Sequence, residues 1–306
     1  MGRPAVTAVD ILPARRRRRA LRPVCLGLVV ALAAAGWWMS APFRGSASSQ
    51  AAVGVHKVQG VTWRPDANQP LFIAVLGSDT RNGPPGGSGR CDAIHIVSIN
   101  PQQKAGSIIN IPRDTWVGSK INDRCVGGPA GMVSALKSLT GIQVQYYVTT
   151  EFSHFMRFID ELGGVTVNVP YGMNDAASGA VFPAGPKHML GGHVLAFSRN
   201  RKDTPKGDFS RAFNQGEVIK ASLAKYRVEA KDPGRILDYV RAAQRHVRFD
   251  IPMDEAIKLA LLARDIDPAN VQNIEPRGRT GSVGAASVVF LEPGDTFTRV
   301  KDDGIY

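Results

Sequence analysis

At residues 71–77 the chain reads Leu71-Phe72-Ile73-Ala74-Val75-Leu76-Gly77, a continuous apolar run that ends in glycine. A run without polar alternation is typical of a strand that is buried on both faces of a sheet. The stretch therefore predicts a central strand, and it places the start of the globular domain at about Leu71.

The segments around this strand alternate between strand and helix patterns. Apolar runs bounded by turn residues predict strands at 93–99, 107–111, 144–148 and 165–169. Apolar residues at helical spacing predict helices at 132–139, 152–159, 192–198, 209–226, 234–245 and 254–263. This order predicts a layered α/β fold with helices on both faces of one sheet.

Three other regions are interpreted from their small, polar or turn residues. Residues 44–70 are small and polar and predict a linker, and residues 171–186, rich in Gly, Ala and Asn, predict a loop. Near the C-terminus, apolar runs at 288–291 and 296–300 flank the turn residues Glu292-Pro293-Gly294-Asp295. We expect these two runs to pair as a hairpin.

The net charge of the 306 residues is +12, and it is unevenly distributed. Residues 1–44 contain eight Arg and one Asp, a net charge of +7, which leaves only +5 for the rest of the chain. A basic tail alone would be typical of a nucleic-acid-binding protein, but here an apolar stretch follows it directly. We therefore expect no nucleic acid among the partners.

This basic tail precedes a candidate membrane segment. Five consecutive Arg and Arg22 are followed by an uncharged stretch at 24–43 that contains Trp37 and Trp38. A basic flank, an apolar run of about 20 residues and interfacial Trp indicate a transmembrane helix with its Arg side in the cytoplasm. We predict a single-pass protein of the cell membrane. A cleaved signal peptide is the alternative, because small residues follow at 45–49.

The resulting organisation is a cytoplasmic tail at 1–23, an anchor at 24–43, a linker at 44–70 and an extracytoplasmic domain at 71–306. The cysteines agree with export, because Cys25 lies in the anchor and leaves Cys91 and Cys125 as a pair. Such a pair is expected to form a disulfide in an oxidising compartment, and two unrelated buried thiols are the alternative. A zinc site would need further ligands that do not lie near them in the sequence.

Charged residues interrupt the apolar pattern where predicted strands begin or end, and these are Asp79, Arg81, Arg90, Asp92, Arg113 and Asp114. Ligands of α/β sheets tend to bind at the carboxyl ends of strands, where the first and third pairs lie. Taken singly, each pair has a plainer interpretation as a structural ion pair or a solvated turn. Together they indicate a site for an anionic ligand.

A second set of polar residues follows in the helical half of the chain. Arg199 and Arg201 would point the same way from an extended segment. Asp208 begins a predicted helix as its N-cap, and Arg211 and Gln215 share one face of that helix. Guanidinium groups chelate phosphate oxygens and carboxylates hold hard divalent cations, so the two sets together suit a metal-bound phosphate.

The chain contains a series of short motifs in this order: Leu76-Gly77-Ser78-Asp79-Thr80-Arg81, Gly89-Arg90-Cys91-Asp92-Ala93, Asn110-Ile111-Pro112-Arg113-Asp114-Thr115, Lys120-Ile121-Asn122, Leu162-Gly163-Gly164-Val165, Phe197-Ser198-Arg199-Asn200-Arg201 and Asp208-Phe209-Ser210-Arg211. They resemble the motifs of the LytR-CpsA-Psr family. The resemblance implies a three-layer α-β-α sandwich with a central mixed sheet. It also implies a membrane-anchored enzyme of a bacterial cell envelope, and the composition is typical of an actinobacterium.

The activity that the resemblance implies is transfer of a glycopolymer from a polyprenyl-pyrophosphate carrier to peptidoglycan, with pyrophosphatase activity as a possible companion. It implies Mg²⁺, or Mn²⁺, held by Asp79 and Asp92 against the pyrophosphate. It assigns phosphate binding to Arg90, Arg113, Arg199, Arg201, Arg211 and Gln215. We expect Asp79, Asp92, Arg113 and Arg201 to be catalytic, and Asp208 to orient the site. Membrane lipid is a further expected partner, because the polyprenyl tail would lie between the sheet and its helices.

Three residues depart from the family pattern. Cys91 replaces a Ser, Cys125 stands where a small or aromatic residue is usual, and Asn214 replaces an Arg. Because Asn214 removes a positive charge, the alternative function is a polyprenyl-phosphate or polyprenyl-pyrophosphate-binding envelope protein with little turnover. A transcriptional regulator is the third possibility, but an exported domain does not reach DNA and the tail contains no helix-turn-helix pattern.

Overall fold

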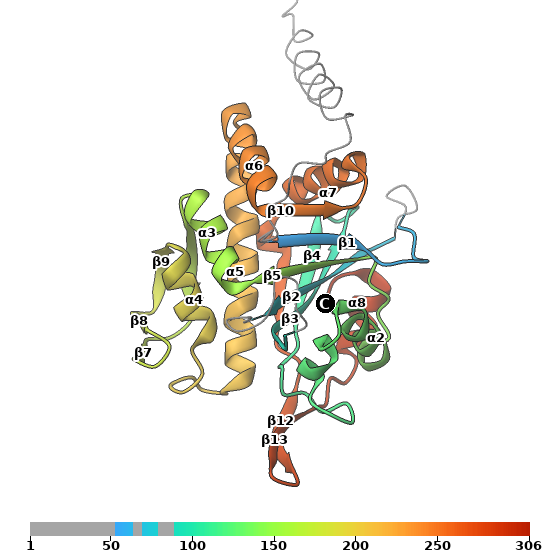
Figure 1. The fold of residues 1–306 in the computed structure, drawn as a ribbon, viewed down its shortest axis with the longest axis vertical. Coiled ribbons are helices and arrows are strands. Elements are labelled where there is room, and N and C mark those ends of the chain that lie inside the picture. The colour runs from blue at the N-terminus through green and yellow to red at the C-terminus, as the bar shows by residue number, and fades with distance from the viewer. Residues whose placement is uncertain (1–52, 64–68, 79–88) are drawn as a thin grey trace, which may run out of the picture. The chain divides into compact units, whose positions relative to one another are not determined.

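The computed structural model describes residues 53–63, 69–78 and 89–306, which Figure 1 shows in colour. The predicted anchor at 24–43, together with Cys25, Asp79 and Arg81, lies outside the described residues. Among the described residues, no helix is long and apolar enough to cross a membrane.

A seven-stranded mixed sheet forms the centre of the domain, in the order β10-β1-β5-β2-β3-β4-β11 (Figure 1). Its strands are β1 (Val53–Lys57), β2 (Leu71–Ser78), β3 (Cys91–Asn100), β4 (Ala105–Asn110), β5 (Tyr146–Glu151), β10 (Val247–Asp250) and β11 (Val271–Ile274). The run at 71–77 is the central strand β2, parallel to β5 and antiparallel to β3. The predicted mixed α/β fold with a central sheet is confirmed.

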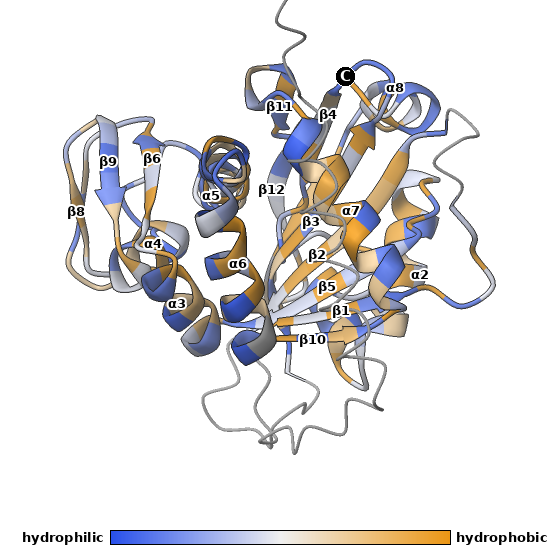
Figure 2. Ribbon diagram, turned by 90° about the horizontal axis from the view of Figure 1, so that it is seen from above, coloured by the Kyte–Doolittle hydropathy of each residue, from blue (hydrophilic) through white to orange (hydrophobic). Residues whose placement is uncertain are grey.

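Helices cover both faces of this sheet because successive strand residues point to opposite sides. On one face, Leu76 and Ile96 pack with Met132 of α2 (Pro129–Thr140) and Val300 of α8 (Thr296–Asp303). On the other face, apolar strand residues pack with α5 (Asp208–Glu229) and α7 (Met253–Asp265). Figure 2 shows the apolar strands between these helices.

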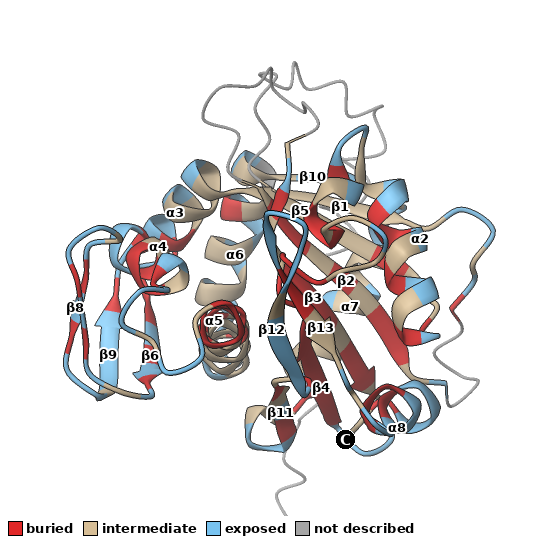
Figure 3. Cartoon of the chain, turned by 90° about the horizontal axis from the view of Figure 1, so that it is seen from below, coloured by how far each residue is buried: buried red, intermediate tan, exposed pale blue. Residues whose placement is uncertain are grey.

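A third cluster packs on the far side of α5, around Val167, Phe197 and Val218. It is built from α3 (Phe152–Glu161), β6 (Val165–Val169), β7 (Met173–Asp175), β8 (Ala180–Phe182), β9 (Gly185–Met189) and α4 (Gly191–Arg199), whose buried parts are red in Figure 3. The loop predicted at 171–186 was therefore wrong in part, because it contains β7, β8 and the start of β9. These strands are too short for their alternation to stand out among small residues.

The sheet also begins earlier than we predicted. The segment interpreted as a linker contains β1, which pairs with β10 on one side and with β5 on the other, and Trp63, which is buried. β10 and β11 were not predicted either. Each of the three strands is only four or five residues long, so its strand structure depends on its neighbours more than on its own pattern.

The C-terminal hairpin was predicted with the wrong partner. β13 (Ala286–Leu291) pairs with the preceding β12 (Gly278–Val283), and residues 296–303 form the helix α8. Phe297 and Val300, three residues apart, are both buried on one helical face. Residues 292–295 therefore lead into a helix instead of closing a hairpin. The remaining helix, α6 (Pro233–His246), follows α5.

Candidate functional site

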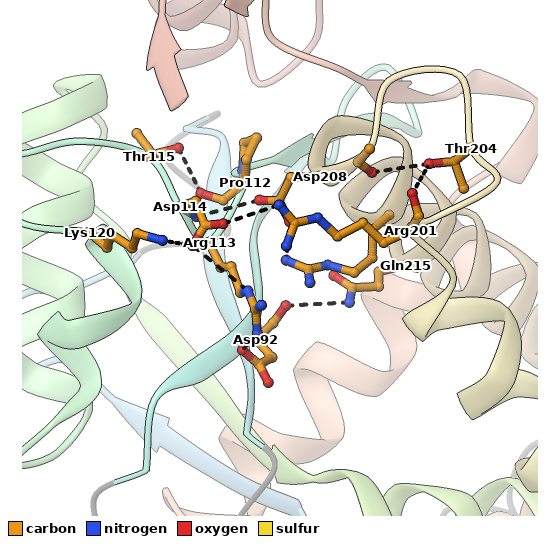
Figure 4. A network of polar contacts seen from close by, with 12 residues as sticks. Asp92, Pro112, Arg113, Asp114, Thr115, Lys120, Arg201, Thr204, Asp208 and Gln215 are labelled. Atoms are coloured by element: carbon orange, nitrogen blue, oxygen red, sulfur yellow. Dashed lines mark hydrogen bonds and ion pairs between the residues drawn. The ribbon is translucent and has the colours of Figure 1, made fainter. Parts of the chain in front are cut away.

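The candidate site lies where one edge of the sheet meets the beginning of α5 (Figure 4). Because β3 is antiparallel to both β2 and β4, the start of β3 lies beside the ends of those two strands. The pairing Ser78↔Cys91 and the pairing His95↔Asn110 fix this register. Asp92 and the residues that follow β4 are therefore brought to the same end of these strands, which is called the strand edge below.

Arg113 and Asp92 form the central ion pair of the site. Nη1 of Arg113 lies 2.5 Å from Oδ1 of Asp92, and both side chains are partly exposed, at 29% and 23%. Burial alone would lower the pKa of Arg113, but its hydrogen bond with Asp92 and the charges of Asp92, Asp114 and Asp208 raise it. The guanidinium is thus permanently charged, and a carboxylate sets its direction.

Asp114 is the most connected carboxylate of the site. Its Oδ1 lies 3.0 Å from Nζ of Lys120 and 3.9 Å from Nε of Arg113, and its Oδ2 lies 3.6 Å from Nη2 of Arg201. The side chain is 8% exposed, so these cations surround a shielded negative charge. Sequence reasoning missed Lys120 and this role of Asp114, although both stand inside motifs that it quoted.

The segment that carries Arg113 and Asp114 is held in place by backbone hydrogen bonds from two directions. The N–H of Val289 in β13 donates to the carbonyl of Asp114 at 2.9 Å, and the N–H of Trp116 donates to the carbonyl of Val289 at 2.8 Å. The N–H of Asn122 donates to the carbonyl of Arg113 at 3.2 Å. The C-terminal hairpin thus supports the site directly.

Asp208 lies inside the site, and its predicted N-cap role is wrong. Gly207 occupies the N-cap position of α5, and Asp208 is the first helical residue. Its buried carboxylate pairs with Arg211 one turn on and accepts a hydrogen bond from the N–H of Asp114 at 3.4 Å. Burial lowers the pKa of Arg211, and the charge of Asp208 opposes this shift. Asp208 therefore connects α5 to the strand edge.

Gln215 bridges two elements through its side-chain amide. Nε2 donates to the carbonyl of Ser198 at 3.1 Å and to the carbonyl of Asp92 at 3.4 Å. Because both partners are acceptors, the NH₂ group must face them, and both of its N–H bonds are directed at the backbone. The structure thus shows a bridge between β3 and α4, and phosphate binding by Gln215 stays a prediction.

The remaining predicted residues lie at different distances from this network. Arg199 ends α4 as an exposed residue, so residues 199–201 are not the extended segment we assumed, and only Arg201 reaches Asp114. Arg90 is exposed and pairs with Asp123 at 2.7 Å. Within the described part of the chain, Arg199 has no ion pair. Asp92, Arg113, Arg201, Asp208, Arg211 and Gln215 are brought together; Arg90 and Arg199 are not part of this network.

Asn214, the residue that removes a positive charge, is fully buried beside Tyr171. Its Nδ2 donates to the hydroxyl of Tyr171 at 3.3 Å. The tyrosine belongs to the region around the third core cluster. The amide therefore joins α5 to that region, while the cations of Arg211 and Arg113 remain at the strand edge.

Cys91 and Cys125 are joined in the structure, with their Cα atoms 5.8 Å apart. Cys91 begins β3 directly before Asp92, and Cys125 ends a short 3₁₀ helix at Ile121–Cys125. This distance lies within the range that a disulfide requires. The pairing attaches the start of β3 to the segment after Arg113.

The carboxylates of the site suit a magnesium ion that the substrate helps to bind. Among the described residues, no group of three or more His, Cys, Asp or Glu could hold a metal ion. Mg²⁺ is commonly bound by one or two protein carboxylates together with substrate phosphates. The partly exposed carboxylate of Asp92, beside several phosphate-binding types of side chain, fits such a shared site and not an all-protein cage.

Comparisons with known proteins agree with this geometry. The polyisoprenyl-teichoic acid–peptidoglycan teichoic acid transferase TagU of Bacillus mycoides is 30% identical over 199 residues, covering 61% of this chain and 62% of the relative. TagV of Bacillus subtilis, named as the same kind of transferase, is 26% identical over 241 residues, 74% of this chain and 60% of the relative. The chain thus spans about three fifths of the length of these relatives.

A solved structure and a family model extend the likeness. The crystal structure of B. subtilis TagV superposes with a TM-score of 0.64 at 26% identity, covering 76% of this chain and 95% of that one. The model of the LytR_cpsA_psr family matches residues 38–302. That match includes the strand edge, α5 and the C-terminal hairpin. The chain therefore belongs to the LytR-CpsA-Psr family.

Proposed function

We propose that this protein transfers a glycopolymer from a polyprenyl-pyrophosphate carrier to peptidoglycan through a phosphodiester bond. The observation that carries the proposal is the arrangement of Arg113, Arg201 and Arg211, which pair with the carboxylates of Asp92, Asp114 and Asp208 at one sheet edge. The names of the relatives TagU and TagV, teichoic acid–peptidoglycan transferases, support the same reaction class.

The arginines supply the electrostatic part of the reaction. Guanidinium groups that are already oriented by carboxylates need little reorganisation when charge develops on the phosphoryl oxygens. Arg113 is oriented by Asp92, and Arg211 by Asp208. The attacking group is a hydroxyl of the acceptor, so no nucleophilic side chain is required. Pyrophosphatase activity belongs to the proposal as transfer to water in place of peptidoglycan.

Magnesium is the proposed cofactor, with manganese as a substitute. Asp92 would hold the ion, with Asp79 as the second ligand expected from the family motif, and the ion would polarise the pyrophosphate as a Lewis acid. The protein residues would bind and orient the substrate: Arg113 and Arg201, which both face Asp114, would contact its phosphates.

The carrier-binding alternative is less favoured by the structure. That alternative rests on the positive charge that is absent at Asn214, yet this residue is buried and donates to the hydroxyl of Tyr171. Arg211, in contrast, keeps its ion pair with Asp208 next to the strand edge. The lost charge therefore does not remove the cations that would stabilise phosphate transfer.

The proposal includes the location of the protein in the cell. The uncharged stretch at 24–43 would anchor the protein in the cell membrane, with the basic tail in the cytoplasm and the catalytic domain outside. There the domain meets both a lipid carrier and peptidoglycan. An oxidising compartment also agrees with the cysteine pair.

The variant Asp92→Ala tests the proposed reaction. We expect release of polyprenyl phosphate from a polyprenyl-pyrophosphate substrate to be abolished, because the variant loses both the proposed metal ligand and the partner that orients Arg113. Circular dichroism should show an unchanged fold. Asp254→Ala removes an exposed carboxylate that pairs with Lys258, and it should react like the wild type. Unchanged turnover of Asp92→Ala would contradict the proposal.

A further inference from the structure

Three polar side chains lie between the sheet and α5. They are His95 in β3, Asn110 in β4 and Asn273 in β11, and they are called the polar seam below. His95 and Asn110 are each 1% exposed. Among the described residues, none of the three forms an ion pair with the charged network, but His95 has a side-chain hydrogen bond with Gln215 of that network.

The hydrogen bonds of the polar seam have one consistent direction. Nδ2 of Asn273 donates to the carbonyl of Phe213 at 3.0 Å and to the carboxylate of Glu217 at 2.8 Å, both on α5. The oxygen of Asn273 must then accept from Nδ2 of Asn110, at 2.6 Å. Nδ2 of Asn110 also donates to the carbonyl of Ile274 at 2.8 Å.

The direction continues to the imidazole of His95. Since Nδ2 of Asn110 is a donor, its oxygen accepts from Nδ1–H of His95 at 2.8 Å. Burial lowers the pKa of His95 to about 4, so the ring is neutral and this N–H defines its tautomer. The donor and acceptor roles in each hydrogen bond therefore depend on those in the next, from His95 in β3 across the sheet to α5.

Helix α5 approaches the polar seam at Gly216. A Cβ atom added there would overlap the amide oxygens of both Asn273 and Asn110. Glycine therefore allows the helix backbone to lie directly on the polar seam. The carbonyl of Phe213 and the carboxylate of Glu217 flank this point. The site residue Gln215 is its neighbour in the helix, and Arg211 lies about one and a half turns before it.

Apolar side chains in these positions would be expected to stabilise the contact at least as well, because buried polar groups lose their hydration. Apolar contacts, however, have little directionality, whereas hydrogen bonds fix both the position of a helix along its axis and its rotation. A shift of about 1 Å in a group that contacts the reacting centre is enough to lower a rate about a hundredfold.

We propose that the polar seam of His95, Asn110 and Asn273 is a positioning device, which fixes α5 on the sheet and so places Arg211 and Gln215 opposite Asp92 and Arg113. The inference rests on the proposed function, because the placement matters for phosphate transfer. It assigns no contact with the substrate to the polar seam. Its residues act only through α5.

The test compares variants that remove hydrogen bonds of the polar seam without leaving a cavity. Asn273→Leu replaces the amide by an apolar group of similar size, Asn273→Asp keeps the shape but loses both donors, and Gly216→Ala pushes the helix away from the amide oxygens. With geranylgeranyl pyrophosphate as substrate and magnesium present, we expect kcat to fall at least tenfold while KM stays within threefold.

Ser98→Ala is the matched control. Ser98 is also buried in β3, but its hydroxyl donates to the carbonyls of Ser107 and Gly304, neither of which lies on α5. This variant should lose stability in thermal unfolding and keep kcat within twofold of the wild type. Asn273→Leu should also unfold at a lower temperature, because the carbonyl of Phe213 and the carboxylate of Glu217 lose their donor, but unlike Ser98→Ala it should have a low kcat while it is folded.

Two results would separate this inference from the function on which it rests. If Asp92→Ala is inactive while folded Asn273→Asp and Gly216→Ala both retain kcat within twofold of the wild type, the positioning role is wrong and the reaction stands. If Asp92→Ala remains fully active, the proposed reaction itself fails. Should Asn273→Leu not fold, the Asp and Ala variants decide the question alone.

Discussion

The guanidinium of Arg113 does two things that a single charge could not do. Its Nη1 contacts Asp92 at 2.5 Å while its Nε faces Asp114 at 3.9 Å. A planar fork that binds one carboxylate still presents further N–H groups to a phosphate, and Nε of Arg113 has no hydrogen-bond partner among the described residues, whereas an ammonium is a point charge. The identity of this residue, and not only its charge, is therefore part of the proposed chemistry.

Arg113→Lys should lower activity at least tenfold, or about 1.4 kcal/mol of transition-state stabilisation. The comparison uses kcat/KM for release of polyprenyl phosphate. Arg124→Lys serves as the control, because Arg124 is exposed and, among the described residues, donates to the carbonyl of Val117 alone. Activity within twofold of the wild type would mean that Arg113 is a structural partner of Asp92 and Asp114.

His95 predicts a pH dependence of stability. Burial lowers its pKa from 6.5 to about 4 in the folded protein, so between these values the unfolded chain binds more protons. Stability therefore falls as the pH decreases from 6.5 toward 4, by about 3 kcal/mol from this group. His95→Gln does not titrate, and urea unfolding at pH 7 and pH 4 should show a smaller loss for it. Equal losses would contradict the assignment.

At the scale of elements, the site depends on connections between segments that do not pair as strands. The short 3₁₀ helix at Ile121–Cys125 is attached to the start of β3 by the Cys91–Cys125 pair and by the ion pair of Arg90 with Asp123. β13 holds the segment after β4 through Val289. Both attachments act on the backbone next to Asp92 and Arg113.

If the cysteine pair is oxidised, the double variant Cys91→Ser, Cys125→Ser should lose about 3 to 4 kcal/mol of unfolding free energy by the chain-entropy model. The loop is long, because 34 positions separate the two cysteines. Urea unfolding measures the loss. Thiol titration of the denatured, unreduced domain without Cys25 should find no free thiol, and two free thiols would show that the bond does not form.

For the whole molecule, the strand β1 decides where the domain begins. It lies between β10 and β5 in the sheet, and the compact unit spans residues 48–306. Without β1, the edge of β5 and the short strand β10 would lose their hydrogen-bonding partner, and exposed strand edges favour aggregation.

A fragment of residues 48–306 should therefore fold and elute as a discrete species in gel filtration. A fragment of residues 71–306, which begins where the apolar run begins, should aggregate or unfold at a lower temperature. Its near-ultraviolet circular dichroism should also be weaker. Equal thermal stability of the two fragments would show that β1 is dispensable.

The sequence alone determined the features that depend on local pattern. The uninterrupted run at 71–77 identified the central strand, and helical spacing located α2, α3 and the long helix α5. Ordered motifs were enough to indicate the family. These features are readable because periodicity reports which face of an element is buried, and because a motif keeps its residues at fixed local spacing.

Tertiary structure decided the partners. Asp114 and Asp208 are 94 residues apart, yet the backbone N–H of Asp114 donates to the carboxylate of Asp208, and Asn110 and Asn273, 163 residues apart, meet beneath α5. Sequence placed Asp208 at an N-cap and paired the run at 288–291 with residues 296–300, whereas 288–291 pairs with β12 and 296–300 belongs to α8. Such contacts depend on the register of distant strands and on how closely α5 lies on the sheet. Local periodicity predicts neither the register nor the distance between α5 and the sheet, because both are set only when the sheet assembles.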